Sequence, residues 1–87
     1  MELTREQRRE IKAFSREVAP YYKLFNWRWG QEQLIPTARE IEELVYNHMD
    51  YINNNHADNV SSGGISVEKN EEGQHEVSWS ITNSIWI

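Results

Sequence analysis

Apolar side chains recur every three or four residues in two stretches of the chain, which is the spacing of an amphipathic helix. The first stretch, residues 4–18, opens with Thr4 and Gln7, which can exchange hydrogen bonds as a capping box. We expect this helix to end near residue 18, because Pro20 disfavours helical geometry at the residue before it. Its predicted core side chains are Leu3, Ile11, Phe14 and Val18.

The second helical stretch covers residues 37–53. Thr37 suits the N-cap position, and Glu40 completes a second capping box. The Asn run at 53–55 is expected to end the helix, because Asn tolerates the left-handed conformation of a helix C-terminus. The wide apolar arc of this helix contains Ile41, Leu44, Val45, Met49 and Ile52.

Aromatic residues crowd the segment 20–30, which fits either a helix or a strand. Tyr21, Phe25 and Trp29 share a helical face, whereas Phe25, Trp27 and Trp29 share a strand face. Pro20 suits the first position of a short helix. We therefore favour one or two helical turns that run into an irregular loop.

The last third of the chain alternates between apolar and polar residues, which predicts a β-hairpin over residues 65–82. Both apolar sets share one face only if Val67 lies opposite Val77 and Ile65 opposite Trp79. That register needs an odd-numbered loop, and residues 71–73 supply three residues that end in a Gly.

Two flanking segments lack this alternation. Residues 54–64 have the composition of a flexible connection. The apolar tail 83–87 is expected to extend the hairpin or to form a short third strand, and its open edge could pair with a second copy of the chain. The predicted fold is α+β: two amphipathic helices packed on a C-terminal antiparallel β-hairpin, in a single domain over residues 1–87.

Composition limits the class of protein. The chain has 87 residues and no cysteine, which excludes a disulfide framework and a thiolate zinc site. No apolar run is long enough to cross a bilayer, and the first residues lack the apolar core of a signal peptide, so we expect a cytoplasmic protein without a membrane partner.

Charge is divided unevenly along the chain. The formal net charge is −5, with +3 in residues 1–30 and −8 in residues 31–87. Such asymmetry indicates either that one half docks on the other or that a charged partner is selected.

The charged residues form two candidate stripes. On the first helix, the cations fall on one arc, and they are Arg5, Arg8, Arg9, Lys12 and Arg16. This basic arc is either solvated, docked on the second helix, or bound to an external acidic surface. The second helix has an acidic edge, to which the hairpin tip adds two carboxylates: Glu40, Glu43, Asn47, Asp50, Glu71 and Glu72. This edge is solvated, contacts a basic patch, or imitates phosphates.

The aromatic segment could add to a binding surface. Trp, Tyr and Arg dominate interface hot spots, and the same mixture stacks on single-stranded bases. Tyr22 and Trp27 are expected to be the more exposed rings, with Arg28 beside them.

The three histidines do not form a reactive site. His48 falls within the apolar arc of the second helix and is expected to be a hydrogen-bonded core residue, whereas His75 beside the hairpin turn is expected to be solvated. His56 and Asp58 could supply two metal ligands, but no residue at suitable spacing supplies more. Since no catalytic or phosphate-binding motif is present, we predict no enzyme activity, cofactor or metal.

These features favour a small protein-binding module, an inhibitor or regulator that contacts a larger protein through complementary charge. In general character the chain resembles the small acidic accessory proteins that bacteriophages and other mobile elements encode. Two alternatives remain: nucleic-acid binding by the basic stripe and aromatic segment, and homo-oligomeric assembly through the C-terminal strand.

Overall fold

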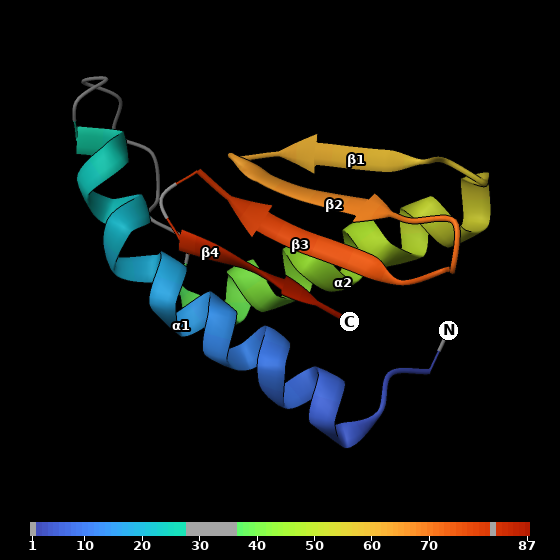
Figure 1. The fold of residues 1–87 in the computed structure, drawn as a ribbon. Coiled ribbons are helices and arrows are strands. Elements are labelled where there is room, and N and C mark those ends of the chain that lie inside the picture. The colour runs from blue at the N-terminus through green and yellow to red at the C-terminus, as the bar shows by residue number, and fades with distance from the viewer. Residues whose placement is uncertain (1, 28–36, 81) are drawn as a thin grey trace.

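A computed structural model describes residues 2–27, 37–80 and 82–87, which form two helices and a four-stranded antiparallel sheet (Figure 1). The helices are α1 (Arg5–Trp27) and α2 (Ala38–Asn55). The strands lie in the sheet in chain order: β1 (Asn59–Ser62), β2 (Ile65–Lys69), β3 (His75–Trp79) and β4 (Thr82–Trp86). The predicted α+β class is confirmed, but the sheet has four strands in place of the two in the predicted hairpin.

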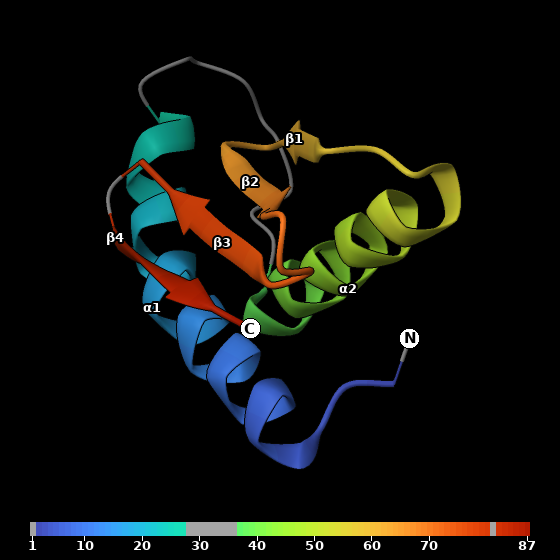
Figure 2. The same ribbon diagram turned by 45° about the vertical axis from the view of Figure 1, so that its right-hand side comes forward.

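Both helices cover the same face of the sheet, which gives two layers (Figures 1 and 2). The α2 helix packs on β1 and β2, and α1 packs on β4. Strand residues alternate accordingly: Val67 and Val77 are buried toward the helices, whereas Ser66 and Ser78, on the opposite face, are half-buried. The core therefore fills the space between the sheet and the two helices.

The α1 helix begins as predicted but continues past its expected end. Gln7 N–H donates to Thr4 Oγ1 over 3.1 Å and Thr4 N–H donates to Gln7 Oε1 over 2.9 Å, which confirms the capping box. The expected end near residue 18 is wrong, because Pro20 lies inside a helix that reaches Trp27.

Tertiary packing explains why Pro20 does not end α1. The φ angle of proline is compatible with a helix, and the penalty is a lost hydrogen bond and a local clash. Two residues later, the Tyr22 ring stacks on Trp79 with 5.9 Å between ring centroids, and the centroid of the Tyr21 ring lies 6.3 Å from that of Trp79. Extending the helix half-buries Tyr22 against the sheet, whereas Tyr21 remains 43% exposed. The packing of Tyr22 on Trp79 offsets the penalty.

The α2 helix is capped at both ends. Glu40 N–H donates to Thr37 Oγ1 over 3.2 Å, which confirms the N-cap. The C-terminal end lies two residues beyond the expected Asn53, and the left-handed residue is His56 with a φ of 52°. Ala57 N–H then donates to Ile52 O over 3.2 Å, which closes the last turn.

The segment expected to be a flexible connection contains the first strand. β1 pairs with β2 through a two-residue turn, Gly63 and Gly64, whose φ values are 60° and 81°. Two positive φ angles are the signature of the turn that matches the natural twist of a hairpin. Val60 is the only apolar residue in β1, so the sequence lacks the alternation that would have indicated a strand.

The register predicted for β2 and β3 is confirmed, with Val67 opposite Val77 and Ile65 opposite Trp79. Residues 71–73 form the loop, and Gly73 has a φ of 82°. The C-terminal tail forms a further strand, since β4 pairs with β3 across a bulge.

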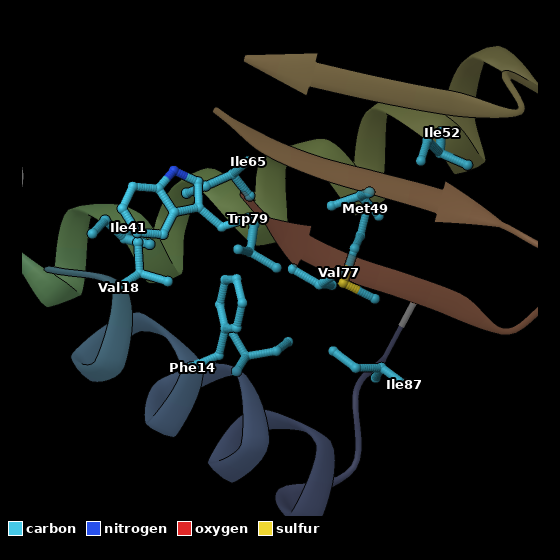
Figure 3. Packing of buried hydrophobic residues seen from close by; sticks show 12 residues of the cluster. Phe14, Val18, Ile41, Met49, Ile52, Ile65, Val77, Trp79 and Ile87 are labelled. Carbon is cyan, nitrogen blue, oxygen red and sulfur yellow. The ribbon is translucent and has the colours of Figure 1, made fainter. Parts of the chain in front are cut away.

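Among the residues whose side chains the structure describes, twelve apolar ones form one core (Figure 3). Phe14 and Val18 of α1 point toward Val77 and Trp79 of β3 in this view. Leu44, expected in the core, is only half-buried at its margin. Neither α1 nor α2, as far as the described residues extend, is long and apolar enough to cross a membrane.

Candidate interaction surfaces

Three acidic residues of α2, together with Asn47, lie on the side of the helix that faces solvent. Spacings of three, four and three residues place all four on one stripe, opposite the buried arc of Ile41, Val45, Met49 and Ile52. All four are exposed, and we call them the α2 acidic stripe: Glu40, Glu43, Asn47 and Asp50. The stripe is held on a helix with both ends capped.

An exposed aromatic ring borders this stripe and was not predicted. Tyr51 has 52% of its surface exposed and directly follows Asp50. On the helical wheel it lies beside Asn47, at the edge of the stripe toward β1. Tyrosine is one of the residues enriched at interface hot spots. The position of Tyr51 between the polar and apolar arcs of the helical wheel is the feature of the sequence that could have predicted its exposure.

The hairpin tip carries Glu71 and Glu72, both exposed. Asn70 Oδ1 fixes this turn by accepting hydrogen bonds from the N–H groups of Glu72 and Gln74, over 3.0 and 2.8 Å. Lys69 Nζ, at the base of the tip, lies 3.4 Å from Asn53 Oδ1. The tip is therefore close to the C-terminal end of α2 (Figure 1).

The five cations predicted to form a stripe on α1 are also exposed, and Arg8, Lys12 and Arg16 lie next to α2. Their predicted arc is therefore accessible, and its members are Arg5, Arg8, Arg9, Lys12 and Arg16. The Arg8 guanidinium lies 5.7 Å from the centre of the Tyr46 ring on α2. The Tyr46 hydroxyl donates to Glu42 Oε1 over 2.6 Å. Burial, together with this bond, raises the pKa of Tyr46 to about 12.

The two charged stripes do not neutralise each other within residues 2–27, 37–80 and 82–87. The one ion pair in these ranges joins Arg39 to Glu43 within α2, at 3.8 Å between highly exposed groups. Exposed pairs of this kind contribute little stability. Cations on α1 and carboxylates on the stripe thus remain available to other molecules.

The aromatic segment only partly matches its prediction. Residues 20–27 are helical, which agrees with the favoured interpretation. The exposure expected for Tyr22 is wrong, because the ring is half-buried against Trp79 and burial raises the pKa of its hydroxyl. The Trp27 side chain and all of Arg28 lie outside what the structure describes. Trp86 on β4, in contrast, is 49% exposed.

Two of the three histidines are buried. His48 is a core residue whose Nε2 lies 3.0 Å from Ser62 Oγ, which confirms its prediction and ties α2 to β1. The solvated state expected for His75 is wrong, since only 2% of its surface is exposed and its Nε2 has no hydrogen-bond partner. The reason is that β4 extends the sheet, and Ile87 exchanges two backbone hydrogen bonds with His75.

Burial affects the titration of both residues. It lowers the pKa of His48, and a hydrogen bond with the backbone of Ser62 offsets part of this effect. It also lowers the pKa of His75, and the nearby Lys69 ammonium lowers it further. His56 and Asp58 do not join a larger cluster, since no group of three potential metal ligands occurs in the described part of the chain.

Comparisons with protein-family models, with curated proteins and with solved structures gave no match to this chain.

Proposed function

We propose that this protein is a non-enzymatic binding module that recognises a larger protein through the α2 acidic stripe. The observation that carries the proposal is the exposure of Glu40, Glu43 and Asp50 on one helical face, with a single weak ion pair inside the described chain. Unneutralised carboxylates held in fixed positions attract a basic surface and select it over neutral ones.

The position of the stripe on the fold supports a binding role. It lies opposite the core-facing side of α2, so a partner can cover it without disturbing the packing of Val45, Met49 and Ile52. The caps at Thr37 and His56 fix the helix before a partner arrives, which reduces the entropy lost on binding.

The partner expected here presents Arg or Lys side chains along a helix or groove. Glu40 and Glu43 are three residues apart on the helix, with Cβ atoms about 5–6 Å apart, and Asp50 follows two turns later, about 10 Å further along the axis. A row of cations can match this spacing. A surface of this kind includes the nucleic-acid-binding groove of a larger protein, and occupation of such a groove would make this chain an inhibitor or regulator. Tyr51 would supply apolar contact at the margin.

Affinity capture from the lysate of the source cell tests this proposal. The bait is the tagged full-length chain, and the variant is the double substitution Glu40→Lys and Glu43→Lys. We expect the wild-type chain to retain a basic protein that elutes at high salt, because salt screens exposed opposite charges within about 10 Å at 0.1 M. The variant should lose this protein, because the two substitutions reverse the charge of the stripe at Glu40 and Glu43.

The matched control is Glu10→Lys with Glu17→Lys, which makes the same charge change on exposed positions of α1. The control should retain the protein that the stripe variant loses. Equal retention by both variants, or equal loss, would show that recognition does not use the α2 acidic stripe.

A further inference from the structure

A groove lies between the two helices, and cations from both line it. Its walls within the described chain are formed by Lys12 and Arg16 of α1 and by Ala38, Arg39 and Glu42 of α2, and its volume is about 380 Å³. This size falls at the lower end of clefts that bind small ligands. Because Ala38 carries only a methyl group, its side chain leaves the space between the longer charged side chains open.

The charges around this groove do not cancel. Glu42 is the only carboxylate among the described residues that line it, and its Oε1 accepts a hydrogen bond from the Tyr46 hydroxyl over 2.6 Å. Neither Lys12 nor Arg16 forms an ion pair with a described carboxylate. Among the described carboxylates, Arg39 pairs with Glu43 alone, at 3.8 Å. The described part of the groove wall therefore carries three cations and one carboxylate that is already engaged.

The arrangement of Lys12 and Arg16 also favours an anion. Like charges four residues apart on a helix repel each other, and an anion between them removes that repulsion. Arg side chains present several N–H donors in a planar fork, and Lys adds three more. A phosphate group offers more acceptor oxygens and more charge than a carboxylate, so it can engage two guanidinium groups and an ammonium together.

We infer that this groove, lined by Lys12, Arg16 and Arg39, is a binding site for a phosphate group. Arg39 of the groove also contacts Glu43 of the α2 acidic stripe, at 3.8 Å, whereas Lys12 and Arg16 lie on α1. The inference does not depend on the function proposed for the stripe. Two sources share this chemistry: the terminal phosphate of a nucleotide and the phosphodiester backbone of an oligonucleotide. The groove recognises the phosphate, and the rest of the ligand extends into solvent.

Titration followed by ¹⁵N NMR of the full chain tests the inference, with inorganic phosphate as the probe and chloride at matched ionic strength as the reference. We expect saturable shifts in the amides of residues 12–16 and 38–42. Arg16→Gln and Arg39→Gln should each weaken phosphate binding about tenfold, because each removes a charge-assisted contact. Arg9→Gln is the matched control, since it removes an equal charge from α1 outside the groove and should change affinity by less than about twofold.

Further probes distinguish the two phosphate sources from each other, and they distinguish binding in the groove from general charge attraction. Adenosine monophosphate and a short single-stranded oligonucleotide without terminal phosphates identify which phosphate is preferred, and binding of either in the groove supports the inference. Shifts spread evenly along α1, equal losses in the Arg9 and Arg16 variants, or equally tight binding of a glutamate peptide would overturn it. The absence of a saturable phosphate effect would overturn it as well.

Discussion

The turn between β1 and β2 depends on two glycines in the left-handed region of backbone space. A Cβ atom added at Gly64 would lie 2.7 Å from Trp79 Nε1, and one at Gly63 would collide with the Tyr22 hydroxyl. The turn therefore lies directly against the stacked rings of Tyr22 and Trp79, which join α1 to the sheet. A side chain at either position would disturb both the turn and this ring pair.

Substitution Gly64→Ala should lower the free energy of unfolding by about 3 kcal/mol, from left-handed strain together with the collision at Trp79. Gly73→Ala is the matched control, because its φ of 82° is similar but the nearest side-chain atom is 3.9 Å away. The control should lose only about 1 kcal/mol. Urea denaturation followed by tryptophan fluorescence measures both, and equal losses would show that Trp79 does not restrict Gly64.

His75 predicts a loss of stability in mild acid. Its pKa is lowered in the folded protein, so the unfolded chain binds more protons below its ordinary value of 6.5. The free energy of unfolding should therefore be constant above that pH and fall as the pH decreases below it. His48 has the same sign and adds to the effect.

Replacement of His75 by Leu tests this dependence, because Leu fills the buried site without a titrating group. We expect the slope of unfolding free energy against pH between about 6.5 and 5 to decrease by about half, with the rest due to His48. His56→Asn is the control, since His56 is exposed and Asn tolerates its left-handed backbone. An unchanged slope in the Leu variant would mean that His75 does not destabilise the folded state in acid.

At the level of the elements, the helices and the central hairpin could be predicted because their signals are local. Thr4 and Thr37 begin helices through contacts with residues three positions away, and the register of Val67 with Val77 follows from alternation and loop length. Two elements could not be predicted, since they depend on contacts distant in sequence. The extension of α1 needs Trp79, and β1 needs pairing with β2 because its own apolar content is a single Val60.

The candidate surfaces also differ in whether local sequence spacing or tertiary packing determines them. Helical spacing alone placed Glu40, Glu43 and Asp50 on one exposed face. The groove between α1 and α2 could not be predicted, because Arg39 meets Lys12 and Arg16 only when the two helices pack. The burial of Tyr22 and His75 likewise depends on β3 and β4 being in place.

Pro20 offers a direct test of how packing holds α1 together. Pro20→Ala restores a backbone donor and removes a clash inside the helix, so the free energy of unfolding should rise by about 1–2 kcal/mol. The gain is smaller than the full cost of an internal proline, because proline also restricts the unfolded chain. Ala13→Gly, at an exposed position of the same helix, should instead lower it by about 1 kcal/mol, which calibrates the measurement. A loss of stability in the Ala variant would show that Pro20 favours the fold.

At the scale of the molecule, the described residues separate their charges on the two helices, with one exposed ion pair inside α2. The salt dependence of stability distinguishes this arrangement from one held by ion pairs. A fold stabilised by ion pairs between α1 and α2 would weaken as salt screens them, whereas a fold with clustered like charges on each helix is unchanged or slightly stabilised. Between about 0.02 and 0.3 M sodium chloride, we expect the free energy of unfolding to stay constant or to rise by a few tenths of a kcal/mol. Complexes through the α2 acidic stripe should weaken over the same range. Urea denaturation at each salt concentration measures the first quantity, and a clear fall in stability would mean that cations and carboxylates already neutralise each other within one chain, leaving little charge for a partner to recognise.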